Sequence, residues 1–123
     1  MKQLCIVLYC LGVLALASNA RSVYLTDKKM EPIQVGAGRS TILSFPSRPT
    51  KVILGSQGMF AIEYVENDIA INALHSPARS NLFVYLEGRR FGFDLRTVGE
   101  VGDEIILVRD ADERKIRVKV KHD

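Results

Sequence analysis

The alternation of apolar and polar residues is the feature of this sequence that most constrains its fold. Stretches with a period of two, such as Phe60–Val65 and Asn81–Leu86, are separated by turn-forming residues about every 8 to 12 positions. Successive side chains of a strand point to opposite faces, so each stretch predicts a strand with one buried face. Beyond residue 20, apolar residues do not recur at spacings of three and four over the length of a helix. The pattern therefore predicts an all-β fold.

The turn signals separate ten alternating stretches, which predict a fold of about nine short strands. Alternating stretches lie at residues 22–26, 32–35, 40–45, 51–54, 60–65, 69–73, 81–86, 89–98, 104–109 and 115–120. The turns at 66–68, 87–88 and 110–113 predict three hairpins and mostly antiparallel pairing. The chain has no internal repeat and no linker, so residues 21–123 predict a single compact β domain. Its architecture is a β-sandwich or a partly open barrel.

The alternation also predicts which side chains are buried. The predicted core consists of Ile62, Tyr64, Ile71, Leu82, Val84, Phe91, Phe93, Ile106, Val108, Ile116 and Val118. Phe83 and Tyr85 point to the opposite side of their strand from these core residues. They form either a second core layer or an exposed aromatic patch, and such a patch would be an interface candidate.

The first 20 residues have the features of a cleavable secretory signal. Lys2 provides a positive start, and the uncharged run Leu4–Ala17 is shorter than the roughly 20 apolar residues of a membrane span. Two sites of small residues follow, one before Ser18 and one before Arg21. The remaining chain contains no Asn-x-Ser/Thr site, which fits a bacterial periplasmic protein. We therefore expect an exported protein without a transmembrane span after cleavage.

The sequence offers no convincing site for a metal or a cofactor. Both cysteines, Cys5 and Cys10, lie in the signal, so the rest of the chain has no disulfide, thiol nucleophile or thiolate ligand. The run starting at Asp110 begins like a calcium loop. However, it has Lys115 where that loop needs glycine and Lys121 where it needs glutamate. We predict neither a metal nor a cofactor.

Enzymatic and nucleic-acid-binding functions are also poorly supported. Gly36–Thr41 lacks the lysine of a phosphate-binding loop and precedes a strand instead of a helix. His75 has only its neighbour Ser76 as a candidate nucleophile, and adjacent residues rarely face each other as a catalytic pair. The formal net charge of +3 is too small for a general nucleic-acid binder. We therefore predict a protein that is not an enzyme.

Two groups of basic residues are candidates for a partner surface. Lys115, Arg117, Lys119 and Lys121 alternate with apolar residues and share one face of the last predicted strand. These side chains either protect an edge strand from aggregation or bind an acidic partner or anionic lipid headgroups. Arg89 and Arg90, which follow a tight turn, form a second cationic group that is open to the same two interpretations.

Part of the chain resembles a known family. The resemblance lies in Ser40–Pro46 with Thr50–Ser56, in the hairpin of residues 60–73, and in Ser80–Tyr85 with Arg89–Arg96. Together these segments resemble the N-terminal β domain of TraK/TrbG/CagX-like proteins of type IV secretion. In that family a strand ending in Phe-Pro precedes a strand with a glycine turn. A Ser/Thr-Asn-Leu strand then pairs with an aromatic-rich strand that follows an Arg or Lys pair. The order of features is also similar to the N-terminal domain of pilus-assembly secretins.

The resemblance covers about Ile33 to Val98 and implies an exported protein of an outer-membrane core complex. Typical members continue into a linker and a second β domain, whereas this sequence ends at Asp123 after one more predicted hairpin. We therefore expect a stand-alone relative that docks on such a complex in the periplasm. Its partners would be other envelope proteins or further copies of itself. The alternative is a soluble periplasmic module that binds a small ligand or an envelope polymer.

Overall fold

The structure is a computed structural model that describes residues 20–112. It contains nine strands in this range: β1 (Ala20–Leu25), β2 (Met30–Gly36), β3 (Ser40–Ser44), β4 (Lys51–Leu54), β5 (Phe60–Val65), β6 (Asp68–Ala73), β7 (Arg79–Leu86), β8 (Arg89–Val98) and β9 (Ile105–Asp110). Their bounds lie within two residues of the stretches that the alternation indicates. The all-β prediction is confirmed.

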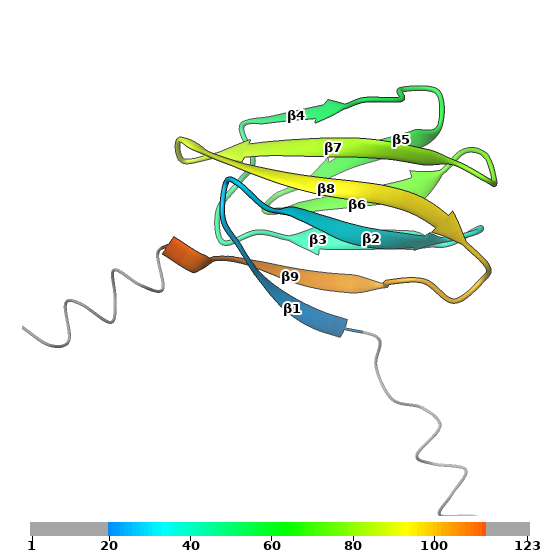
Figure 1. Ribbon diagram of the computed structural model, residues 1–123, viewed down its shortest axis with the longest axis horizontal. Helices are drawn as coiled ribbons and strands as arrows, with labels where there is room; N and C mark the ends of the chain where they lie inside the picture. Colours follow the sequence, from blue (N-terminus) through cyan, green and yellow to red (C-terminus); the bar gives the residue numbers. More distant parts are fainter. Residues whose placement is uncertain (1–19, 113–123) are drawn as a thin grey trace, which may run out of the picture.

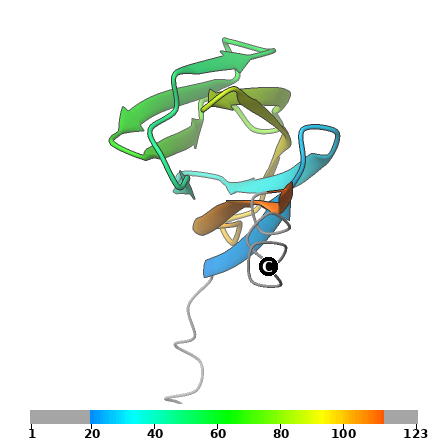
Figure 2. The same ribbon diagram turned by 90° about the vertical axis from the view of Figure 1, so that its left-hand side faces the viewer.

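The strands form two open sheets that face each other (Figures 1 and 2). One sheet has the order β1-β9-β3-β6-β5 and the other has the order β2-β8-β7-β4. The expected architectures were a β-sandwich and a partly open barrel, and two separate open sheets that face each other are consistent with the sandwich. Both sheets are mixed, because β9 runs parallel to β1 and β3, and β2 runs parallel to β8.

Two of the three predicted hairpins lie entirely within the described residues, and both are confirmed. β5 pairs with β6, and β7 pairs with β8, each in antiparallel register. The tight turn between β7 and β8 has positive φ angles at Glu87 (51°) and Gly88 (70°). Positive φ at both central residues is the geometry that matches the twist of a two-residue hairpin.

The third predicted hairpin, of residues 104–109 with 115–120, stays a prediction, because residues 115–120 lie outside the described part of the chain. Among the described residues, β9 has two parallel neighbours that the sequence did not indicate. β1 occupies one edge of β9, while β3 pairs with Ile105 to Leu107 on the other edge. A turn signal indicates antiparallel neighbours only, so it could not reveal these two parallel partners.

The core lies between the inner faces of the two sheets, as the alternation predicts. Seven predicted core residues are at most 2% exposed: Ile71, Leu82, Val84, Phe91, Phe93, Ile106 and Val108. Phe45 and Phe93 meet edge to face across the core, with ring centroids 6.2 Å apart. Ile62 is partly buried and packs against this cluster. The predicted core residues Ile116 and Val118 lie outside the described residues.

Tyr64 is the incorrect prediction in this set, because its side chain is 56% exposed. Burial declines along β5 from Phe60, which is buried, through partly buried Ile62 to Tyr64. β5 is the edge strand of its sheet, and the edge strand of the opposite sheet, β4, has only four residues. The second half of β5 therefore extends beyond the area that the opposite sheet covers.

Two ionic clusters join the sheets at their borders. Arg21 of β1 contacts Asp103 and Glu31 of β2, each at 3.1 Å. The hydrogen bonds to Asp103 are the main cause of a raised pKa for Arg21. Elsewhere, Arg89 of β8 contacts Asp110 of β9 and donates a hydrogen bond of 2.6 Å to Asp112. These contacts fix the relative position of the sheets.

Candidate docking surface

The outer face of the β2-β8-β7-β4 sheet carries the described residues that sequence reasoning assigned to a partner surface, except Arg89. Along β7, Leu82 and Val84 face the core, so Phe83 and Tyr85 face outward. Both aromatic side chains are half-buried and lie outside the core cluster. Of the two alternatives for them, the structure favours a patch on the outer surface over a second core layer.

The strand register assembles an apolar row around Phe83. Phe83 is opposite Ile53 of β4 on one side and Gly92 of β8 on the other, and Gly92 is opposite Met30 of β2. Ile53 is 42% exposed and Met30 is 37% exposed. We call Met30, Gly92, Phe83 and Ile53 the apolar row.

Gly92 makes this row continuous across β8. A Cβ atom at this position would collide with Sδ of Met30 and would lie 3.2 Å from Cε1 of Phe83. The absence of a side chain lets Met30 lie over β8 against the Phe83 ring. Glycine within a strand often marks such a close approach. The Met30 and Phe83 side chains thereby form one apolar surface, although their strands are not neighbours.

Charged residues flank the apolar row on both sides. Tyr85 is opposite Lys51 of β4 and Arg90 of β8, and both of these basic side chains are exposed. Farther along β7, in the other direction, Arg79 is opposite Arg96. We call Arg79 and Arg96 the arginine row.

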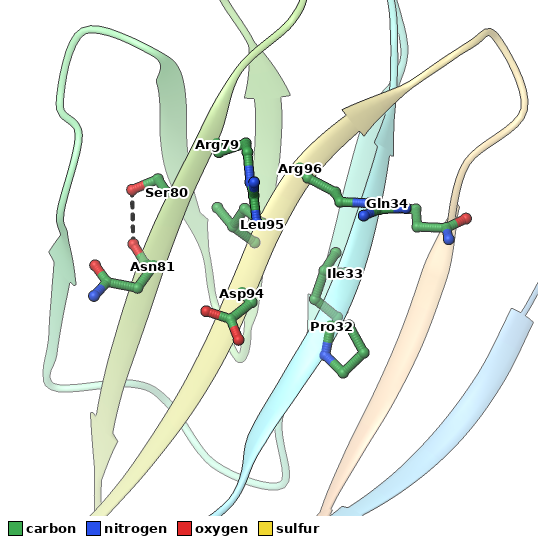
Figure 3. A pocket seen from close by; sticks show the side chains of 9 residues that line it. All are labelled: Pro32, Ile33, Gln34, Arg79, Ser80, Asn81, Asp94, Leu95 and Arg96. Atoms are coloured by element: carbon green, nitrogen blue, oxygen red, sulfur yellow. Dashed lines mark hydrogen bonds between the residues drawn. The ribbon is translucent and has the colours of Figure 1, made fainter.

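The arginine row borders a shallow depression of about 680 Å³ in this face (Figure 3). Its lining comprises Pro32, Ile33, Gln34, Arg79, Ser80, Asn81, Asp94, Leu95 and Arg96 from β2, β7 and β8. Figure 3 shows the Arg79 side chain extending from β7 toward β8, and the Arg96 side chain pointing toward Gln34 of β2. The exposed groups around the depression are thus two guanidiniums, two amides and the Asp94 carboxylate.

The remaining residues of the predicted partner surface have different surroundings. Arg89 is engaged with Asp110 and Asp112, and a hydrogen bond to Asp112 is the main cause of its raised pKa. Its charge is therefore compensated within the fold, whereas Arg90 is exposed next to Tyr85. The predicted stripe of Lys115, Arg117, Lys119 and Lys121 lies outside the described residues and stays a prediction.

Sequence reasoning missed most of this surface. Met30, Ile53 and Lys51 come from strands distant in sequence from Phe83, so only the register places them beside it. Arg79 lies outside the strand predicted for residues 81–86, although β7 begins there. The available signal was the alternation itself, because Arg79, Asn81, Phe83 and Tyr85 occupy every second position of one strand.

Neither a metal centre nor a membrane helix emerges from the part of the chain that the structure describes. No three His, Cys, Asp or Glu side chains between residues 20 and 112 are grouped so that they could hold a metal ion. In the same range, no helix has the length and apolar character to cross a bilayer. No protein-family model matches the chain, and no curated protein matches it either.

Proposed function

We propose that this protein is a periplasmic, non-enzymatic adaptor of a secretion, conjugation or pilus complex in the cell envelope, acting by packing against other proteins. The observation that carries the proposal is the apolar row on the outer face of the β2-β8-β7-β4 sheet. Exposed apolar side chains that form a contiguous patch rimmed by polar groups are typical of protein interaction sites. The signal-like first 20 residues and the resemblance to TraK/TrbG/CagX-like proteins support the location and the type of complex.

The composition of the surface fits a partner interface. Aromatic residues, methionine and arginine are enriched where proteins bind each other, and Phe83, Tyr85, Met30 and Arg90 supply all three kinds. Phe83 and Met30 form the centre, while Lys51 and Arg90 lie toward the rim. This arrangement favours a partner with an apolar anchor and negative charge nearby.

A pair of matched variants tests the proposal. Ile53→Glu places a charge in the apolar row, and Ile105→Glu places the same charge on the other sheet at an equally exposed isoleucine, since both are 42% exposed. The tagged protein is cross-linked in its native cells and purified from the envelope. We expect a secretion, conjugation or pilus component to be recovered with the parent and with Ile105→Glu. With Ile53→Glu we expect its recovery to fall at least tenfold.

Two results would contradict the proposal in different ways. If no such component is recovered with the parent, the adaptor function is wrong. If Ile53→Glu and Ile105→Glu recover it equally, the adaptor function stands but the apolar row is not its docking surface. Both variants must keep the parent's thermal unfolding curve, because a loss of folding would reduce recovery without any effect on the interface.

A second candidate function is a soluble binding module for a small ligand or an envelope polymer. The depression beside the arginine row favours it, because guanidinium and amide groups converge there on one concave surface. The neighbouring genes discriminate between the two candidates. Secretion or conjugation genes favour the adaptor, and sugar-utilisation or transport genes favour the binding module.

A further inference from the structure

The arginine row places two positive charges directly opposite each other on an exposed sheet surface. Arg79 and Arg96 are Cα partners in the antiparallel β7–β8 pair, and both side chains are exposed. Like charges directly opposite each other destabilise a sheet. Asp94 shares this face of β8 with Arg96. Within residues 20–112, however, neither Arg79 nor Arg96 forms an ion pair with Asp94 or any other carboxylate. Among the described residues, no carboxylate is therefore paired with either guanidinium.

Arg21, Arg39 and Arg89 each lie within 4 Å of at least one carboxylate. Among the described residues, exposed Arg48, Arg90 and Arg109 form no such ion pair either. Arg79 and Arg96 differ from these three because they lie directly opposite each other and border the depression. Two unpaired guanidiniums next to a depression are suited to a carboxylate from another molecule, because the guanidinium fork binds carboxylates with two parallel hydrogen bonds.

We infer that Arg79 and Arg96 form a clamp for a carboxylate side chain on an acidic segment of the protein partner, whose apolar anchor lies on the apolar row. This inference rests on the proposed function and adds the chemistry of the partner. Phe83 and Arg79 are four residues apart on β7, a distance of about 13 Å along a strand. The partner's apolar anchor and its carboxylate are therefore separated by about 13 Å.

Asp94 gives the surface its selectivity. It lies between the apolar row and the arginine row, opposite Asn81 and Pro32. A carboxylate of the partner placed there would meet a like charge, which disfavours binding. Asp94 therefore disfavours partners with a shorter spacing between anchor and carboxylate, so the surface uses repulsion as well as attraction.

The arginine side chains can be observed directly by NMR. The purified ¹⁵N-labelled protein is titrated with hexaglutamate, and the Nε–Hε signals of Arg79 and Arg96 are followed. We expect both signals to shift, and we expect the dissociation constant to rise at least tenfold in the double variant Arg79→Gln/Arg96→Gln. The charge-matched control, Arg48→Gln/Arg109→Gln, removes two exposed arginines elsewhere and should stay within twofold of the parent. Asp94→Asn should tighten binding severalfold.

Competing ligands and a melting experiment can overturn the inference. Equal binding by the two double variants contradicts the clamp, and so does a response to inorganic phosphate as strong as that to hexaglutamate. Stronger binding to phosphatidylglycerol vesicles assigns the row to a membrane surface instead. Removing one of two like charges should leave the melting temperature of Arg96→Gln unchanged or higher, whereas a lower value indicates a structural role for Arg96.

The clamp and the proposed function can fail separately. In the native-cell cross-linking experiment, Arg79→Gln/Arg96→Gln should recover at least tenfold less of the envelope partner than Arg48→Gln/Arg109→Gln. If the partner is lost with Ile53→Glu but retained with Arg79→Gln/Arg96→Gln, the adaptor function stands and the clamp is wrong. If the parent recovers no envelope component at all, the adaptor function itself is wrong.

Discussion

The two faces of the β2-β8-β7-β4 sheet are built from the same strands but differ in burial and composition. The inner face is apolar and closed, with Leu82, Val84 and Phe93 fully buried. The outer face has one apolar row between two groups of basic residues, and its side chains are exposed or half-buried. A side chain on the inner face contributes mainly to stability, while one on the outer face is available to a partner. The difference indicates where substitutions will affect folding and where they will affect binding.

The largest expected effect is the difference in stability between two truncations on opposite faces of β7. Leu82→Ala should reduce the free energy of unfolding by about 2–5 kcal/mol, because it leaves a cavity in a fully buried site. Phe83→Ala should reduce it by about 1 kcal/mol or less, since a cross-strand contact on a half-buried surface contributes about that much. Urea denaturation of both variants measures the difference. Equal losses in the free energy of unfolding would show that side chains on the two faces contribute equally to stability.

An intermediate effect should come from Arg21, whose charge serves the fold. Arg21→Gln leaves the carboxylate of Asp103, 18% exposed, without its cation. The carboxylate of Glu31, 13% exposed, keeps only the more distant contact with Lys29 at 3.9 Å. We expect a loss of about 1–2 kcal/mol, at the lower end for such charged hydrogen bonds because Arg21 itself is 37% exposed. The control is Arg39→Gln, which opens a more exposed pair with Glu104 and should cost less than about 0.5 kcal/mol. Urea melts that rank the two variants in the reverse order would contradict this assignment.

The smallest effect should come from the basic stripe near the C-terminus. Lys119→Glu and Lys121→Glu together should change the unfolding free energy by less than about 0.5 kcal/mol, because isolated surface charges contribute little. Partner recovery should also stay unchanged at low and at moderate salt. Loss of the partner with normal melting would show instead that this stripe, like the arginine row, binds an acidic surface.

Alternation and turn residues predicted the strands, whereas the pairing of strands distant in sequence could not be predicted. The β7–β8 hairpin was predictable because alternation and the Glu87–Gly88 turn are both local. Parallel neighbours such as β1 and β9 have no turn between them, so nothing in the sequence marks their register. Burial at the end of β5 also depends on what the opposite sheet covers, which is why Tyr64 was assigned incorrectly.

The candidate docking surface also contains residues that the sequence predicts and residues that only the strand pairing reveals. The positions of Phe83, Tyr85 and Arg90 could be predicted from the sequence. All three lie in the β7–β8 hairpin, whose register follows from its tight turn. Met30 and Ile53 join them only through the pairing of β2 with β8 and of β4 with β7. The clamp needs still more information, because an arginine is recognised as unpaired only when all its neighbours in space are known.

The pairing of the first strand with the last described one has a consequence for the order of folding. β9 is the neighbour of β1 in the sheet, and Arg21 meets Asp103 across 82 positions of sequence. Closing so large a loop is slow relative to forming hairpins. Because a chain is synthesised from its N-terminus, β1 has no partner strand until Ile105–Asp110 has been made. Until then its apolar residues Val23 and Leu25, which the fold buries, remain open to water or to a chaperone.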